Sequence, residues 1–245
     1  MKNIYFLLLV LFTLNNFSFA QSDSSKVEIS GDLVSRYIWR GADYGNAPAI
    51  QPTIKWNWKN LEIGAWGSFG ISQYSFAETD LYISYTYKKR VKITATDYFV
   101  SFSKEETPNY FSYNQDGTAH VFEGSVTFLG PEKVPVDLLI GMNLYGADAR
   151  RYHENGDENG IQYSTYVELL YEYKNCEFFI GGNLTDPKEE FHESGYYGEY
   201  IGVINIGVKA TKEIKVTDHF SLPAFVTLAA NPQTQKIFMV MGISL

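Results

Sequence analysis

The stretch YVELLYEYKNCEFFIGGNL, residues 166–184, alternates apolar and polar side chains on both sides of a central Lys-Asn step. Alternation with a period of two is typical of a β-strand, and two such runs joined by two polar residues predict a β-hairpin turning at Lys174-Asn175. Glu168, Glu172 and Glu177 then share one face, and apolar or aromatic side chains cover the other. The hairpin alone leaves open whether the apolar face meets the core of a soluble sandwich or lipid.

The same alternation recurs from Lys26 to Leu245, where twelve segments with this pattern can be drawn, and the first of them places Val27, Ile29, Leu33, Tyr37 and Trp39 on one face. Helical periodicity is not convincing in any segment, and no apolar run after residue 20 approaches the roughly 20 residues that a membrane helix needs. The sequence therefore predicts an all-β fold. Either a sandwich or a single antiparallel transmembrane β-barrel of twelve strands would show this alternation.

The connections between these segments alternate in length. Short steps such as Lys59-Asn60, Lys88 to Arg90, Gly130 to Pro135 and Lys212 to Lys215 separate longer polar loops such as 41–47, 101–117, 147–160 and 185–196. Short turns at one end and longer loops at the other are typical of outer-membrane barrels, in which the short turns are periplasmic and the longer loops extracellular. An even number of strands then puts both termini on the periplasmic side.

Aromatic side chains make up 16% of the residues and gather near the expected strand ends, on the apolar phase. Two aromatic girdles at two membrane interfaces explain that placement, because a ring-shaped side chain there has one end in hydrocarbon and one among headgroups. This observation favours a barrel over a sandwich. The predicted girdle residues are Trp39, Trp56, Trp58, Tyr85, Tyr87, Phe128, Tyr171 and Tyr173.

The N-terminal region has the features of a cleaved secretory signal. Lys2 precedes an apolar run, and Ser18-Phe19-Ala20 places small residues where a signal peptidase reads them. We therefore expect residues 1–20 to be a signal peptide and residues 21–245 to form the barrel. Export of such a chain requires periplasmic chaperones and a barrel-assembly machinery as partners.

Charge and cysteine content narrow the function classes. The formal net charge is −8, so nucleic acid is an unexpected partner, and the single Cys176 provides no intramolecular disulfide. The four histidines are scattered without ligand spacing, and ENGDENG (154–160) lacks the spacing of a calcium loop. We expect no metal and no cofactor.

Four segments carry a resemblance to a known family. VSRYIWRG (34–41), PAIQPTIKW (48–56), AETDLYISYTY (77–87) and FEGSVTF (122–128) resemble, in order and approximate spacing, the TorF-type porin family of Gram-negative bacteria. The resemblance covers most of the chain beyond residue 20, although its motifs are short. It implies a location in the cell outer membrane and a channel role.

Charged residues on the phase opposite the apolar one would face the inside of a barrel, and acids outnumber bases there. They predict a channel for passive diffusion of small polar solutes with a weak cation preference. The alternative is a filled lumen, in which Arg36 and Arg40 pair with acids and the protein has a structural or surface-binding role, because twelve strands lie between filled and open barrels. The predicted lumen residues are Asp32, Arg36, Arg40, Lys55, Glu62, Glu78, Asp80, Lys92, Glu123, Glu168, Glu172 and Lys209.

An enzyme is the remaining alternative. A phospholipase-like barrel would need a nucleophile and a histidine on its lipid-facing wall, and Asp218-His219-Phe220-Ser221 supplies a His-x-Ser pair. By the strand phase that pair points away from lipid, near a periplasmic turn, and His120 has no serine two positions on. We therefore expect no catalytic activity. Asp97 falls on the lipid-facing phase, which a position near the interface or a bulge would explain.

Overall fold

The computed structural model describes residues 25–45, 47–72, 76–102, 108–115, 117–218 and 220–245. The expected signal peptide, residues 1–20, lies outside this part of the chain. No helix within the described residues is long and apolar enough to cross a membrane.

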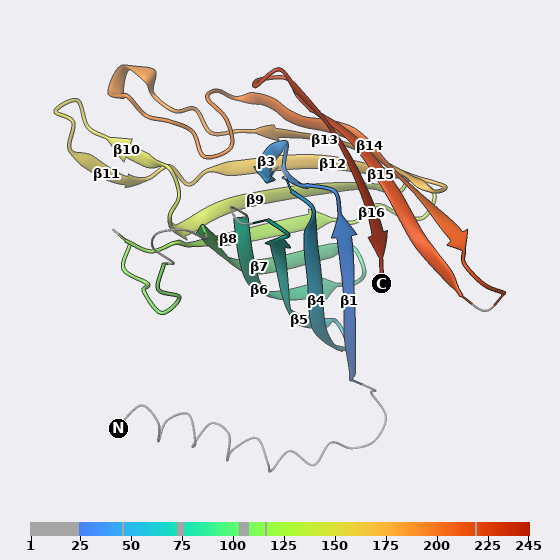
Figure 1. Cartoon of the computed structure of the whole chain (residues 1–245). Coiled ribbons are helices and arrows are strands. Elements are labelled where there is room, and N and C mark those ends of the chain that lie inside the picture. The colour runs from blue at the N-terminus through green and yellow to red at the C-terminus, as the bar shows by residue number, and fades with distance from the viewer. Residues whose placement is uncertain (1–24, 46, 73–75, 103–107, 116, 219) are drawn as a thin grey trace, which may run out of the picture.

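Twelve antiparallel strands form a closed barrel, so the predicted fold class is confirmed (Figure 1). Neighbours in the sequence are neighbours in the wall, and β1 closes the ring by pairing with both β4 and β16. The wall consists of β1 (Lys26–Val34), β4 (Ala49–Trp58), β5 (Leu61–Gly70), β6 (Phe76–Tyr87), β7 (Val91–Phe102), β8 (His120–Phe128), β9 (Val136–Gly146), β12 (Thr165–Tyr173), β13 (Cys176–Asn183), β14 (Gly202–Lys215), β15 (Ser221–Asn231) and β16 (Lys236–Ser244).

Two short hairpins and a single-turn 3₁₀ helix are inserted between wall strands. Strands β2 (Tyr37–Trp39) and β3 (Ala42–Gly45) pair between β1 and β4, and β10 (Arg150–Tyr152) and β11 (Glu158–Ile161) pair between β9 and β12. The 3₁₀ helix η2 (Glu189–Phe191) lies between β13 and β14.

The wall owes its two surfaces to the alternation in the sequence. In the predicted hairpin, Leu169 pairs with Ile180 and Tyr171 with Phe178, and all four side chains are exposed on the outer surface. Tyr166, near the start of β12 and on the opposite phase, is fully buried on the inner surface. Because successive side chains of a strand point to opposite faces, this register leaves an apolar belt outside and polar groups inside.

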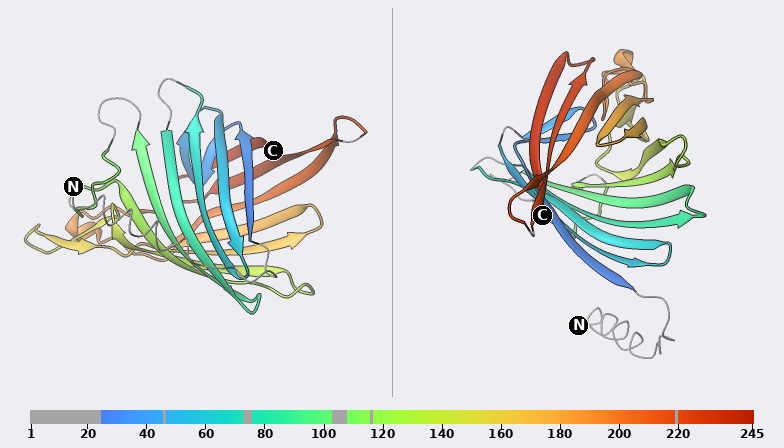
Figure 2. Two further views of the ribbon diagram at one scale, coloured as in Figure 1. Left: turned by 90° about the horizontal axis from the view of Figure 1, so that it is seen from below. Right: turned by 90° about the vertical axis from the view of Figure 1, so that its right-hand side faces the viewer.

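Tight turns and longer connections gather at opposite ends of the barrel (Figure 2). Lys59, Lys88 and Lys174 each begin a tight turn with a positive φ of 48° to 57°. In each case the ammonium lies 5.1–5.3 Å from the centroid of the preceding aromatic ring. One predicted turn is misplaced, because β14 continues through the expected Lys212–Lys215 step and ends at Lys215.

The first wall strand is shorter than predicted. We expected one strand from Val27 to Trp39, but β1 ends at Val34 and the chain then leaves the wall. The backbone amide of Ser35 still donates to the Met241 carbonyl at 2.8 Å, so the departure begins directly after the seam with β16. Residues 37–45 fold into the separate β2–β3 hairpin, which lies within the ring of strands (Figure 1).

Candidate functional site: the barrel lumen

The β2–β3 hairpin crosses the lumen near the end with the longer connections. Its turn is formed by Arg40 and Gly41, whose φ values of 48° and 77° suit a tight hairpin turn. A Cβ added to Gly41 would lie 1.9 Å from the carbonyl oxygen of Ile204 on β14, so the tip touches the wall where only glycine fits. The Gly41 carbonyl also accepts a hydrogen bond from Asn231 Nδ2 at 3.1 Å.

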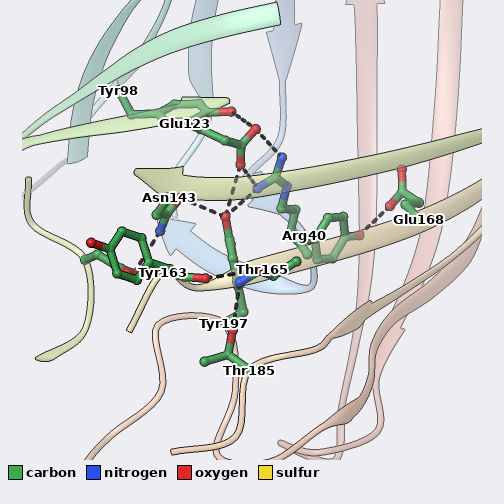
Figure 3. Close-up of polar contacts among 11 residues, drawn as sticks. Arg40, Tyr98, Glu123, Asn143, Tyr163, Thr165, Glu168, Thr185 and Tyr197 are labelled. Atoms are coloured by element: carbon green, nitrogen blue, oxygen red, sulfur yellow. Dashed lines mark hydrogen bonds and ion pairs between the residues drawn. The ribbon is translucent and has the colours of Figure 1, made fainter. Parts of the chain in front are cut away.

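Arg40 extends from this turn and forms a bidentate ion pair with Glu123 on β8 (Figure 3). The second contact, from Nη2 to Oε1, measures 3.0 Å. The two side chains are 9% and 2% exposed, so both charges are buried and compensate each other. Two charges taken out of water are stable together only when their geometry is good and their remaining polar atoms are bonded.

Neighbouring side chains form hydrogen bonds with the remaining polar atoms of Arg40 and Glu123. Tyr197, from the segment between β13 and β14, accepts from Arg40 Nη1 at 2.6 Å and lies 3.1 Å from Glu123 Oε2 and 3.2 Å from Asn143 Oδ1. Burial raises the pKa of the Tyr197 hydroxyl well above its ordinary value, so it keeps the proton that it donates. Tyr98 donates to Glu123 Oε1 at 3.3 Å.

Aromatic rings surround the Arg40 guanidinium. Its carbon lies 4.5 Å from the ring centroids of both Trp39 and Tyr166, and 5.3 Å from that of Tyr197. Trp39 in turn packs against Tyr98 at 5.3 Å. Such stacking strengthens the site, because a desolvated cation over a ring face is attracted by the ring quadrupole.

Trp39 is therefore not part of the outer aromatic girdle, where we predicted it. We predicted it there because the alternation of β1 continues in the sequence past Val34. In the structure Trp39 belongs to the hairpin inside the barrel. The other predicted girdle residues lie at strand ends beside tight turns and on the outward phase, with the pairs Trp56–Trp58 and Tyr171–Tyr173 stacked at 6.3 and 6.4 Å. These residues are Trp56, Trp58, Tyr85, Tyr87, Phe128, Tyr171 and Tyr173.

The remainder of the hairpin packs against two other parts of the inner wall. Tyr37 contacts the rings of Trp66 on β5 and Phe76 on β6, with centroids 5.5 and 5.9 Å away. Ile38 packs on an apolar patch that consists of Val34, Ala49, Phe225 and Val240. The hairpin therefore contacts wall strands on several sides of the ring.

A cavity of about 480 Å³ lies beside the hairpin within the lumen. Its wall mixes charged and amide groups with apolar side chains from the β15–β16 region. The polar groups are Asp32, Arg36, Gln51, Glu168, Glu177, Asn205 and Lys209. Arg36 also forms an ion pair with Asp43 of the hairpin at 3.7 Å.

Further charges form a ladder along the inner wall toward the tight turns. Lys55 bridges Glu28 at 3.3 Å and Glu62 at 3.6 Å, and Lys92 extends the series from Glu62 at 3.8 Å. Lys209 makes a similar contact with Glu177, also at 3.8 Å. These ammonium groups are about one third exposed, unlike the guanidinium of Arg40.

The predicted lumen residues thus fall into three groups. Arg36 and Arg40 lie in and beside the hairpin, whereas we predicted them on the wall, because the chain turns inward after β1. Glu78, Asp80 and Glu123 are buried on the wall at the level of the hairpin, where Arg40 meets Glu123 alone. Those nearer the cavity and the ladder are Asp32, Lys55, Glu62, Lys92, Glu168, Glu172 and Lys209.

Sequence reasoning missed the tyrosines of the site and Asn143. Tyr166 and Tyr197 lie around Arg40, and Tyr37 is buried against the inner wall, yet all three look like ordinary members of an aromatic-rich chain. One signal was present, because Gly41, directly after the expected strand, is a residue typical of tight turns. No group of three or more Asp, Glu, His and Cys side chains gathers to hold a metal ion among the described residues.

A second polar cluster lies on the outer wall. His120 is fully buried, with Nδ1 2.7 Å from Asp97 Oδ1 and Nε2 2.6 Å from the carbonyl oxygen of Tyr110. Its ring stacks on Tyr113 with centroids 4.6 Å apart, so the loop segment 108–115 covers the pair. The predicted His-x-Ser pair cannot be compared, because His219 lies outside the described residues.

Comparison with known proteins adds no family: no protein-family model matches the chain, and no curated protein matches it.

Proposed function

We propose that this protein is an outer-membrane channel for small polar solutes and that its β2–β3 hairpin closes the lumen in the conformation described. The closed barrel fits an outer-membrane protein, since its apolar outer belt is suited to lipid. The resemblance to TorF-type porins supports the same location and role.

The observation that carries the proposal is how the hairpin is attached. The hairpin pairs only within itself and contributes no strand to the wall, so its removal leaves every ladder of the barrel intact. The cavity beside it and the charge ladder beyond it provide polar surface that a tightly packed barrel would not need. A displaced hairpin would connect these surfaces to the outside.

The filled-lumen alternative also has an observation in its favour. Arg40 and Glu123 are buried and bidentate, and aromatic rings occupy the lumen around them. Such a closure could be permanent, in which case the barrel has a structural or surface-binding role. The channel and the filled barrel differ in one measurable property: only the channel should conduct ions once the hairpin is loosened.

Planar bilayer recordings on the purified full chain test this directly. We expect rare, small openings for the wild type and frequent, larger ones for Arg40→Ala, because the hairpin loses its main anchor. His120→Ala is the matched control, since it removes buried hydrogen bonds from the outer wall and should leave conductance unchanged. If neither the wild type nor Arg40→Ala conducts at any voltage or salt concentration, the filled-lumen role takes the place of the channel.

Selectivity follows from the inner-wall charges. Carboxylates that face the lumen outnumber the basic groups there, so the open state should have a weak preference for cations. Reversal potentials of Arg40→Ala channels in a KCl gradient measure this preference, and a potential of the anion-selective sign would contradict it.

An enzymatic role finds little support on the outer wall. A histidine that activates a nucleophile uses one ring nitrogen for the orienting carboxylate and the other for the nucleophile. In His120 the second nitrogen is already engaged by the Tyr110 carbonyl. We therefore propose a transport role without catalysis.

A further inference from the structure

Glu78 and Asp80 are a pair of buried carboxylates on the inner face of β6. Two residues apart on one strand, their side chains point to the same side of the wall. They are only 4% and 5% exposed, although both lie in the lumen at the level of the hairpin. Two neighbouring carboxylates in such a position repel each other and lose their hydration.

Neither carboxylate is compensated by a basic side chain. Within the described part of the chain, no Lys, Arg or His forms an ion pair with Glu78 or Asp80, whereas the equally buried Glu123 binds Arg40. Glu78 Oε2 and Asp80 Oδ1 are both buried without a hydrogen-bond partner. Buried carboxyl oxygens without partners are rare in proteins, and each one calls for a physical explanation.

Polar and aromatic groups of the hairpin and of the wall surround the pair. The Tyr37 hydroxyl of the hairpin interacts with Glu78, the Phe99 backbone amide interacts with Asp80, and the two carboxyl groups interact with each other. The rings of Tyr37 on β2 and Phe76 on β6 pack 5.9 Å apart, and the Tyr44 ring of the hairpin packs 4.9 Å from that of Phe76. The pair thus lies between β6 and the closing hairpin, in an aromatic shell.

We propose that Glu78 and Asp80 bind a hard divalent cation of the Mg²⁺ and Ca²⁺ class. Two carboxylates neutralise its charge, and the absence of sulfur and imidazole groups from the pair disfavours zinc or copper. A pair of carboxylates is a common protein contribution to a Mg²⁺ site, in which waters fill the other positions. The site does not depend on whether the barrel conducts.

Thermal unfolding of the purified full chain in detergent tests the site. With Mg²⁺ or Ca²⁺ in place of a chelator, at constant pH and ionic strength, we expect the wild-type Tm to rise by about 5 °C. The double variant Glu78→Gln/Asp80→Asn should lose this rise. In chelator it should melt at or above the wild type, because two buried carboxyl groups that repel each other and lack a basic partner are gone. Addition of the cation should therefore make the wild type the protein with the higher Tm, whereas in chelator its Tm is equal to or below that of the double variant.

Glu62→Gln is the matched control. Glu62 is also a carboxylate of the inner wall, but it already has Lys55 and Lys92 as partners, so its loss should leave the cation-dependent rise in place. Equilibrium dialysis with radioactive Ca²⁺ should show one more bound ion per wild-type chain than per double-variant chain. If the double variant does not fold, Asp80→Asn alone serves for both measurements.

A shared proton is the competing explanation for the pair. It predicts that the wild-type Tm is the same in Mg²⁺, Ca²⁺ and chelator, and that the wild type and the double variant bind equal amounts of Ca²⁺. Either result would overturn the cation site.

Discussion

Strand β8 carries a buried, hydrogen-bonded pair of polar side chains on each of its two faces. Glu123 points into the lumen and binds Arg40, while His120, three residues earlier, points outward and binds Asp97. The odd spacing puts the two side chains on opposite surfaces of the same strand. The inner pair joins residues 83 positions apart and seats a hairpin, whereas the outer pair joins adjacent strands and lies beneath a neighbouring loop.

This difference shows how buried polar side chains find partners on the inner and on the outer surface of the wall. Inside, the hairpin supplies both the partner of Glu123 and the rings that exclude water. Outside, Asp97 stays on the lipid-facing phase without a bulge, because the β6–β7 and β7–β8 registers pass through it regularly. Pairing with His120 and cover by the loop, rather than a re-aimed side chain, make the aspartate tolerable there.

Breaking the inner pair should have the largest effect. Arg40→Ala leaves Glu123 buried without its cation, so we expect a loss of about 3–5 kcal/mol in the free energy of unfolding. Urea unfolding in lipid vesicles, followed by tryptophan fluorescence, measures it.

The double replacement Arg40→Leu/Glu123→Leu is the control for this pair. It removes both charges together and should recover most of the lost stability, because no buried charge remains unpaired. Equal destabilisation of the single and the double variant would mean that side-chain packing, and not the ion pair, holds the hairpin in place.

Breaking the outer pair should cost less. His120→Ala removes the hydrogen bonds to Asp97 and to the Tyr110 carbonyl, and we expect a loss of about 1–3 kcal/mol. Residues 108–115 should then become cleavable by chymotrypsin, since Tyr113 loses its stacking partner. An unchanged cleavage pattern would show that the loop is held by other contacts, such as that between the Tyr145 hydroxyl and the Tyr113 carbonyl at 2.6 Å.

The hairpin tip offers a test without any charge. Gly41→Ala requires a side chain at a φ of 77° and within 1.9 Å of a backbone oxygen, so we expect destabilisation of about 2 kcal/mol. Gly45→Ala, in the same hairpin, meets no atom within 4 Å and should be close to neutral. Similar melting temperatures for the two variants would contradict the close seating of the tip on β14.

The sequence predicts the barrel well because alternation is repeated in every wall strand. The register of 166–184 follows from its pattern, since a shift of one residue would turn Glu168 toward lipid. The hairpin could not be predicted in the same way, because Tyr37 and Trp39 continue the phase of β1 without a break. Its position depends on contacts with Glu123 and Ile204, which are far away in the sequence and have no local signal.

The smallest expected effect concerns another ion pair, at the rim of the barrel, where Arg151 is 28% exposed although the Glu193 side chain is buried. Glu193 accepts hydrogen bonds from Arg151 Nη1 at 2.5 Å, from the Lys188 amide at 2.8 Å and from the Tyr152 amide at 3.1 Å. Burial opposes the charged form, but these donors outweigh it and lower the pKa of Glu193 below its ordinary 4.5. A carboxyl with a lowered pKa stabilises the fold above its unfolded pKa, and that stability is lost as the pH falls through the folded value. We expect a loss under about 1 kcal/mol.

Hydrogen exchange of residues 150–161 and 186–193 at pH 6 and at pH 3 measures this loss. Relative to the intrinsic exchange rate at each pH, exchange of the β10–β11 hairpin should accelerate at the lower pH in the wild type. It should be fast at both pH values in Glu193→Gln, whose amide cannot replace the charged acceptor. The Arg40–Glu123 region should stay protected at both, because its carboxylate lies under the hairpin rather than at the rim. Equal acceleration of the two regions would mean that acid loosens the whole barrel. The acid sensitivity of an ion pair would then not depend on how deep in the lumen the pair lies.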